Sequence, residues 1–278
     1  MDFKNYLVPG KTGLLIGIGG VSMSPLAEVL HDAGLDIRGS DMAESSNTLT
    51  LREHGIPIHI GHSADNVTDD ISFVIRTAAV HDDNPEVHEA HRRGIPVFER
   101  TQAWGALMRG YQNALCISGT HGKTTTTSMC THIMMAAEKD PTVMIGGTLP
   151  LLKACHRVGK GNTIIMESCE YYNSFLALNP TIAVVLNIEA DHLDFFKDLE
   201  DIKHSFRCFA ERVPAETGTV IANYDDANTM DALRGIARKV ITFGLNAKAD
   251  VYAQNIVHRG SVSEFDIYHR GNYFARVT

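Results

Sequence analysis

Short continuous runs of apolar residues alternate with segments of helical periodicity along most of this chain. The run at 12–18 is typical of a parallel strand that is buried on both faces. We expect Ser24 to cap a helix after it, with Pro25 at the first helical position and Gly34 beyond the end. The apolar positions of that helix recur at helical spacing: Leu26, Val29, Leu30 and Ala33. The pattern predicts the start of a βαβ unit.

The same alternation predicts an α/β protein with parallel strands over most of its length. Further strands are expected at 36–39, 58–60, 73–76, 96–99, 142–145, 163–166, 181–188, 218–222 and 239–243. Helices are expected at 84–93, 123–137, 201–211 and 230–237. From Val251 onward the period changes to strict alternation. A turn at 270–272 then predicts an antiparallel hairpin formed by 262–267 and 273–277.

Composition limits the class of protein without identifying it. The 278 residues are 44% hydrophobic and 21% charged, which is ordinary for a soluble globular protein of roughly two domains. The net charge of −8 argues against nucleic acid as a partner. No apolar run approaches the ~18 residues of a membrane span. The five cysteines are odd in number and show no C-x-x-C spacing, so we expect reduced thiols and a cytoplasmic location.

A glycine-rich loop between a predicted strand and a predicted helix is the strongest chemical signal. Residues 118–127 read S-G-T-H-G-K-T-T-T-T and follow the apolar run at 114–117. Backbone N–H groups in such a loop and the dipole of the following helix favour a phosphate group. Lys123 adds a positive charge, and Thr124 offers a hydroxyl ligand for Mg²⁺. Because Ile117 occupies the first glycine position of the strict G-x-x-x-x-G-K-[ST] pattern, an ordinary turn is the alternative.

A second glycine turn follows the first predicted strand. It reads G-I-G-G-V-S at 17–22, and Asp41 falls where a dinucleotide-binding fold places its acidic residue. Ser22 replaces the third glycine, so the fingerprint is incomplete. We expect a nucleotide-type ligand here, with a tight structural turn or an NAD-dependent enzyme as alternatives. His62 lies at the end of another predicted strand, where a side chain can reach such a ligand.

Polar residues follow two predicted strands in the second half of the chain. Glu167 follows the strand at 163–166. The strand at 181–188 is followed by Glu189, Asp191, His192 and Asp194. Because carboxyl ends of parallel strands meet at one edge of a sheet, these residues are expected beside the phosphate loop. The arrangement predicts a site for a nucleotide and a metal ion, with solvated loop residues as the alternative.

Taken in order, these motifs resemble those of the Mur ligases, the ATP-dependent amide-forming enzymes of peptidoglycan synthesis. The most specific matches are G-T-H-G-K-T-T-T at 119–126 and N-I-E-A-D-H-L-D at 187–194. Shorter matches lie at 17–20, 39–41, 83–86, 145–147 and 174–176. Within the family the chain is most similar to the members that join L-alanine to UDP-N-acetylmuramate. The ligase that reattaches a recycled tripeptide to the same nucleotide sugar is the alternative.

The resemblance implies a domain assignment and a set of site residues. Residues 1–112 would form a Rossmann-like, doubly wound domain for the UDP sugar, and residues 113–278 a P-loop α/β domain for ATP that ends in the antiparallel hairpin. The implied UDP-sugar residues are Gly17, Gly19, Gly20, Ser40, Asp41 and His62. The implied ATP-binding residues are Gly119, Thr120, His121, Gly122, Lys123, Thr124 and Thr125. The implied metal ligands are Thr124, Glu167 and His192, and the implied catalytic residues are Lys123, His121, Glu167 and His192.

The implied reaction is activation of a carboxylate by ATP and Mg²⁺. The lactyl carboxylate of UDP-N-acetylmuramate would become an acyl phosphate, and the amine of L-alanine would then displace phosphate. Phosphate oxygens repel an attacking carboxylate, and Lys123 with the bound metal would reduce that repulsion. This chemistry needs no covalent nucleophile from the protein.

Two departures from the family pattern stand out. Many relatives read E-A-D-E-S-D where residues 167–172 read E-S-C-E-Y-Y, so Cys169 and Tyr172 receive no role. The family also continues into a G-x-H-N-x-x-N segment and a third domain for the amino acid, and neither follows residue 278 here. We therefore expect a truncated chain with little or no ligase activity by itself. A catalytically incomplete fragment that binds the nucleotide sugar is the alternative function.

Overall fold

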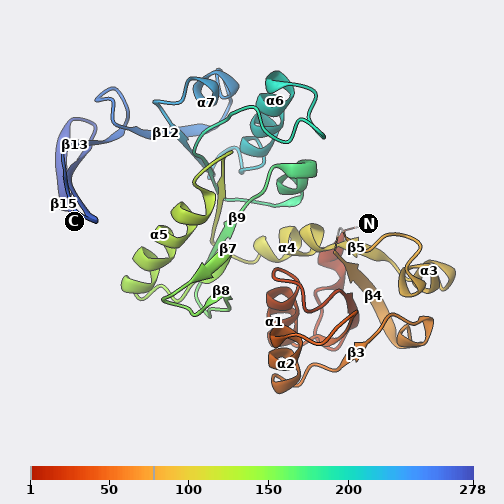
Figure 1. The fold of residues 1–278 in the computed structure, drawn as a ribbon. Coiled ribbons are helices and arrows are strands. Elements are labelled where there is room, and N and C mark those ends of the chain that lie inside the picture. The colour runs from red at the N-terminus through yellow and green to blue at the C-terminus, as the bar shows by residue number, and fades with distance from the viewer. Residues whose placement is uncertain (1, 78) are drawn as a thin grey trace. The chain divides into compact units, whose positions relative to one another are not determined.

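The computed structural model describes residues 2–77 and 79–278, which divide into two compact units (Figure 1). Unit 1 consists of the described residues within Met1–Tyr111 and Met134–Asn162, and unit 2 of Gln112–Ile133 and Thr163–Thr278. The α/β class predicted from the sequence is confirmed. Among the described residues, no helix is both long enough and apolar enough to cross a membrane.

The described part of unit 1 contains a parallel sheet of five strands in the order β3-β2-β1-β4-β5. The strands are β1 (Thr12–Ile16), β2 (Asp36–Asp41), β3 (Ile58–Ile60), β4 (Ile71–Arg76) and β5 (Val97–Glu99). The chain adds β2 and β3 on one side of β1 and then returns to place β4 on the other side. The order therefore reverses between β1 and β4, and open α/β sheets bind ligands at such a switch point.

Helices and shorter elements complete the described part of unit 1. They are η1 (Phe3–Tyr6), α1 (Ser24–Asp32), α2 (Ser46–Glu53), η2 (Ala64–Asn66), α3 (Pro85–Arg92), α4 (Arg100–Met108) and the antiparallel pair β7 (Thr142–Leu149) and β8 (Ala154–Arg157). All five residues of β1 are buried, as its continuous apolar run predicts. Strand β8 was not expected, because its sequence A-C-H-R lacks an apolar pattern.

The start of α1 differs from the prediction. Ser24 is the first helical residue, Met23 is the N-cap, and the Ser24 hydroxyl finds no hydrogen-bond partner among the described residues. The backbone N–H groups of Met23 and Ser24 donate instead to the carbonyl of Gly20. The glycine turn therefore satisfies the first donors of the helix, and the predicted Ser24 cap is wrong. Gly34 adopts a left-handed φ of 87° just beyond the helix, as predicted.

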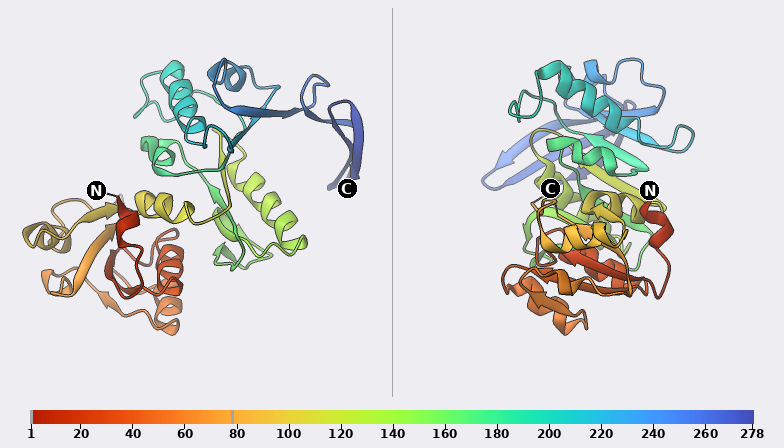
Figure 2. Two further views of the ribbon diagram at one scale, coloured as in Figure 1. Left: turned by 180° about the vertical axis from the view of Figure 1, so that it is seen from behind. Right: turned by 90° about the vertical axis from the view of Figure 1, so that its right-hand side faces the viewer.

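The described strands of unit 2 follow the order β15-β14-β13-β12-β11-β10-β6-β9 within their sheet. Its parallel part comprises β6 (Asn113–Ser118), β9 (Thr163–Glu167), β10 (Ile182–Val185), β11 (Thr219–Asn223) and β12 (Lys239–Gly244). Strand β13 (Val251–Arg259) joins β12 in parallel and pairs with β14 (Val262–His269) in the antiparallel direction. Strand β15 (Asn272–Val277) completes the antiparallel part, and Figure 2 shows β13–β15 together in blue near the C-terminus.

The predicted hairpin is confirmed, with a third strand before it. The sequence indicated β14 and β15, and the structure adds β13 as the antiparallel partner of β14. The predicted strand at 181–188 is shorter, because β10 ends at Val185 and the following residues turn toward the phosphate loop. The remaining elements of unit 2 are the first part of α5 (Lys123–Ala136), η3 (Tyr171–Ala177), α6 (Leu199–Ala210) and α7 (Ala227–Ala232). The helix expected at 230–237 thus begins three residues earlier and is shorter.

Candidate functional site

The phosphate loop predicted in unit 2 joins β6 to α5. Gly119 has a φ of 145°, and a Cβ atom there would lie 2.9 Å from Cβ of Leu186 and 3.2 Å from the backbone nitrogen of Asn187. Gly122 also has a positive φ, of 83°. A side chain at Gly119 would collide with the end of β10, so the close loop geometry requires glycine at that position. This cradle is the kind of backbone that approaches a phosphate group.

Asn187 holds the loop in place, a role that the sequence did not indicate. The His121 backbone N–H donates to Oδ1 of Asn187 at 2.8 Å, and Nδ2 of Asn187 donates to the His121 carbonyl at 3.1 Å. The Thr120 N–H donates to the Asn187 carbonyl at 3.0 Å. The Glu189 N–H donates to the Thr120 hydroxyl at 2.9 Å. The segment after β10 therefore fixes both sides of the loop.

Lys123 points back over the loop and pairs with Glu170. Its Nζ lies 3.1 Å and 3.2 Å from the two carboxylate oxygens of Glu170 and donates to the carbonyls of Gly119 and Thr120. The side chains of Lys123 and Glu170 are 15% and 3% exposed. The pair places a partly buried positive charge at the loop where phosphate oxygens would bind. Glu170 was missed, because nothing in the sequence connects it with Lys123.

The predicted metal ligands come together only in part. The Thr124 hydroxyl donates to Oε1 of Glu167 at 3.0 Å, which joins two of the three. Nε2 of His192 lies 3.9 Å from Oε1 of Glu170 and 3.9 Å from Oδ2 of Asp191. Within residues 2–77 and 79–278, no group of three or more His, Cys, Asp or Glu side chains is arranged to hold a metal ion. The hydroxyl and carboxylate oxygens nevertheless fit Mg²⁺, which usually takes one or two carboxylates and completes its shell with water and substrate phosphates.

His192 is held by a stacked tyrosine. The rings of Tyr171 and His192 stack with centroids 4.5 Å apart, and the Tyr171 hydroxyl donates to Oδ2 of Asp194 at 2.5 Å. That hydrogen bond raises the pKa of Tyr171 and lowers the pKa of Asp194. His121, in contrast, is largely exposed, with Nε2 3.6 Å from Oε2 of Glu189. His192 is thus positioned by its neighbours, whereas His121 extends from the loop toward solvent.

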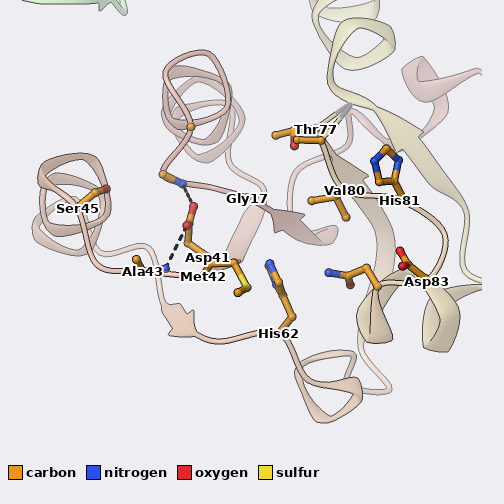
Figure 3. A pocket seen from close by; sticks show the side chains of 14 residues that line it. Gly17, Asp41, Met42, Ala43, Ser45, His62, Thr77, Val80, His81 and Asp83 are labelled. Carbon is orange, nitrogen blue, oxygen red and sulfur yellow. Dashed lines mark hydrogen bonds between the residues drawn. The ribbon is translucent and has the colours of Figure 1, made fainter.

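A separate pocket of about 650 Å³ lies in unit 1 at the carboxyl ends of its strands (Figure 3). It is lined by Gly17, Gly19, Gly20, Asp41, Met42, Ala43, Ser45, His62, Thr77, Ala79, Val80, His81, Asp83 and Asn84. Residues that follow β1, β2, β3 and β4 all contribute. The pocket therefore occupies the switch point of the sheet, which is where the topology predicts a ligand.

Five of the six residues predicted for the UDP sugar line this pocket, and Ser40 does not. Ser40 is fully buried in β2, and its hydroxyl donates to Oε2 of Glu86 at 2.7 Å. Its carbonyl accepts hydrogen bonds from the N–H groups of Gly17 and Ile18. Along β2, Ser40 thus faces inward behind the pocket, and the next residue, Asp41, reaches the pocket. A role of Ser40 toward the ligand stays a prediction.

Asp41 shapes the glycine turn. Its Oδ2 accepts a hydrogen bond from the Gly19 N–H at 2.8 Å, and its Oδ1 accepts one from the Ala43 N–H at 3.4 Å (Figure 3). A Cβ atom at Gly19 would lie 2.8 Å from Cγ2 of Thr48, so the turn can pass close to α2 only with glycine. Gly17 has a φ of 77°, which glycine also tolerates. The turn is narrow and its backbone is exposed toward the pocket.

Comparison with known proteins gives two family matches that together cover most of the chain. Residues 15–112 match the family model described as "Mur ligase family, catalytic domain", and residues 117–277 match "Mur ligase middle domain". The UDP-N-acetylmuramate–L-alanine ligase of Agathobacter rectalis is 47% identical over 87% of this chain and 53% of its own length. The enzyme of the same name from Clostridium novyi is 45% identical over 96% of this chain and 58% of its own length. The chain spans about half the length of the curated relatives it matches.

Solved structures share the fold. The UDP-N-acetylmuramate-alanine ligase of Thermotoga maritima has a TM-score of 0.77 and 28% identity, and the match covers 96% of this chain and 60% of that one. The UDP-N-acetylmuramate:L-alanyl-gamma-D-glutamyl-meso-diaminopimelate ligase of Neisseria meningitides has a TM-score of 0.83 and 25% identity, with coverage of 96% and 87%. Both contain a counterpart of nearly the whole chain.

Proposed function

The chain belongs to the Mur ligase family, and on that premise we propose that it carries the nucleotide-sugar and ATP sites of a UDP-N-acetylmuramate–L-alanine ligase. The observation that carries the proposal is a phosphate loop with a paired lysine in unit 2, accompanied by a separate glycine-turn pocket in unit 1. Identity of about 45% to ligases of that name supports the choice of substrates.

We assign ATP to the phosphate loop of unit 2. Mur ligases use ATP, which when bound would supply the γ-phosphoryl group that converts the lactyl carboxylate to an acyl phosphate. The glycine loop at 119–122 and the N-terminus of α5 would bind phosphate oxygens, and Lys123 would neutralise part of their charge. Thr124 and Glu167 would hold Mg²⁺ through oxygen. His192, the third proposed ligand, lies 3.9 Å from Glu170. Asn187 keeps the loop in shape for this role.

We assign UDP-N-acetylmuramate to the pocket of unit 1. The turn at Gly17, Gly19 and Gly20 brings backbone close to the space where a diphosphate would lie. Asp41 and His62 line the same space and offer polar atoms for the nucleoside. The domain assignment predicted from the sequence, 1–112 for the sugar nucleotide and 113–278 for ATP, stays a prediction. So does the cytoplasmic location.

Calorimetry with the 278-residue chain tests the proposal directly. We expect UDP-N-acetylmuramate and Mg-ATP each to bind with a stoichiometry of about one, as two separate sites require. NADH serves as the control, because an incomplete dinucleotide fingerprint is the main competing interpretation of Gly17 and Asp41. Binding of NADH in place of the sugar nucleotide would contradict the proposal. Binding of the sugar nucleotide without Mg-ATP would support the fragment that binds sugar alone.

A second candidate is the ligase that joins a tripeptide to the same nucleotide sugar. The structural match to the Neisseria meningitides enzyme, with a TM-score of 0.83 over 96% of this chain, favours it. The two candidates share UDP-N-acetylmuramate and ATP and differ in the amine. Because little or no ligation is expected of the chain by itself, the comparison concerns any residual release of ADP. Stimulation by L-alanine would support the first candidate, and stimulation by the tripeptide would favour the second.

A further inference from the structure

A carboxylate is buried directly behind the pocket of unit 1. Glu86 lies in the first turn of α3, and its side chain is 0% exposed. Asn84, which lines the pocket, caps this helix by accepting hydrogen bonds from the backbone N–H groups of Glu86 and Val87. A buried carboxylate is costly unless hydrogen bonds compensate for lost hydration. The side chains that form hydrogen bonds with Glu86 therefore indicate the role of this buried carboxylate.

Three polar side chains converge on Glu86 within the described part of unit 1. Ser40 Oγ lies 2.7 Å and His62 Nδ1 2.8 Å from Oε2, while Asn66 Nδ2 lies 2.6 Å from Oε1. An ionised carboxylate can only accept hydrogen bonds. If Glu86 is ionised, Nδ1 of His62 carries the proton that points at it, because an unprotonated Nδ1 would set one lone pair against another. The Ser40 hydroxyl bonds the same Glu86 oxygen and lies 3.2 Å from Nδ1 of His62, so this side of the imidazole ring faces both Glu86 and Ser40.

The other nitrogen of this ring is the one that a ligand can meet. His62 lines the pocket, its side chain is 12% exposed, and Figure 3 shows the ring directed into the space between Asp41 and Val80. With Nδ1 committed to Glu86, Nε2 is the polar atom of the ring that remains for the pocket. In many histidine sites a carboxylate behind the ring fixes the tautomer in this way.

We propose that Glu86 is the positioning residue of the nucleotide-sugar pocket: it holds the proton on Nδ1 of His62 and so presents Nε2 to a polar group of a nucleoside diphosphate sugar. The inference rests on the proposed function for the identity of the ligand. The state of His62 in the ligand-free chain does not depend on that identity. Two measurements can therefore separate the two claims.

The first measurement is the tautomer of His62 by ¹⁵N NMR on the ligand-free chain. In the wild type we expect the shifts of an Nδ1 that carries a proton. In Glu86→Gln the amide offers a donor as well as an acceptor, so the His62 nitrogen shifts should change. Glu89→Gln, one helical turn further along α3, is the matched control and should leave them unchanged. A wild-type His62 without a proton on Nδ1, or wild-type shifts in Glu86→Gln, would overturn the proposal.

The second measurement is calorimetry with UDP-N-acetylmuramate. We expect Glu86→Gln to weaken binding by roughly tenfold or more and to leave Mg-ATP binding unchanged. In a His62→Ala background the same substitution should have little further effect, because Glu86 acts through His62. Equal weakening in both backgrounds would show a merely structural role and overturn the proposal. If Glu86→Gln does not fold, Glu86→Asp, which retracts the carboxylate from Nδ1, replaces it in both measurements.

Failure of the proposed function gives a different result. In that case the wild-type chain would not bind UDP-N-acetylmuramate at all, and the role of Glu86 toward this ligand would fall with it. The NMR measurement would still decide whether Glu86 sets the state of His62.

Discussion

The pairing of Lys123 with Glu170 determines how the phosphate loop responds to substitution. Lys123→Met would remove the charge proposed for phosphate binding and leave Glu170, 3% exposed, without its cation. We expect a loss of about 3 kcal/mol in the free energy of unfolding, as for other broken buried pairs, together with loss of Mg-ATP binding. Denaturant unfolding and calorimetry measure the two effects.

A double variant separates stability from binding at this pair. Lys123→Met/Glu170→Gln removes both charges, so most of the lost stability should return while Mg-ATP binding stays absent. Full Mg-ATP binding in either variant would contradict the role proposed for Lys123. An unchanged free energy of unfolding in the single variant would contradict the importance of the pair.

Gly119 gives a second prediction for single residues. Gly119→Ala would force a Cβ atom to within 2.9 Å of Leu186 and keep a φ of 145°. We expect a loss of about 2 kcal/mol in stability and a marked loss of Mg-ATP binding. Gly235→Ala is the matched control, since Gly235 also has a positive φ, of 68°, with no atom within 4 Å of the added Cβ. Equal effects of the two substitutions on Mg-ATP binding would contradict the proposed need for glycine at position 119 of the loop.

Cys116 provides a third prediction. It is buried in β6 next to the phosphate loop, and burial raises the pKa of its thiol to about 12. Because the thiolate is the reactive form, we expect Cys116 to resist alkylation at pH 8 in the folded chain and to react after unfolding. Mass spectrometry of iodoacetamide-treated protein measures this. Alkylation of Cys116 in the folded chain at the rate of exposed Cys169 would contradict the burial.

At the residue scale, the sequence predicted the loop and missed the side chains that support it. Lys123, Gly119 and Thr124 belong to a contiguous motif whose spacing carries the information. Asn187 and Glu170 act across long stretches of chain, and single-sequence spacing does not encode such contacts. Glu86 and Asn187 lay in stretches that resembled the family, but the resemblance alone assigned them no role.

At the scale of elements, α3 carries a pH-dependent contact. Glu89 accepts hydrogen bonds from Arg92 and Arg93, and these lower its pKa from 4.5 to about 2. A lowered pKa in the folded state adds stability above pH 4.5, and that stability is lost as pH falls toward 2. We expect Glu89→Gln to be less stable than the wild type at pH 7. The melting temperatures of the variant and the wild type should converge as the pH falls from about 4.5 to about 2. A constant difference in melting temperature across that range would contradict the pairing of Glu89 with the two arginines.

The sequence predicted the presence of the strands more accurately than the residues at which they end. Continuous apolar runs identified β1, β6, β9 and β11, because strands covered on both faces need apolar residues throughout. Leu186 and Ile188 are apolar as well, but β10 ends at Val185, and Asn187 between them bonds to the phosphate loop. Residue preference predicts Ser24 as the cap of α1, whereas Met23 is the N-cap and the Gly20 carbonyl accepts the first N–H groups.

At the scale of the whole molecule, the two compact units each contain a glycine-dependent turn at the carboxyl edge of a sheet. The sequence predicted both turns and the order in which they occur. It could not distinguish residues that line a pocket from residues just behind it, as the burial of Ser40 shows. That distinction depends on which face of β2 each side chain occupies, which a short buried strand does not reveal in its pattern.

The central claim is that one unit binds the sugar nucleotide and the other binds ATP. Calorimetric titration of one variant in each site with both ligands tests it. We predict that His62→Ala weakens UDP-N-acetylmuramate binding by about tenfold or more and leaves the Kd for Mg-ATP within about twofold. Lys123→Met should abolish Mg-ATP binding and leave UDP-N-acetylmuramate binding unchanged. Loss of both ligands in either variant, or of the opposite ligand, would contradict the assignment of the two sites.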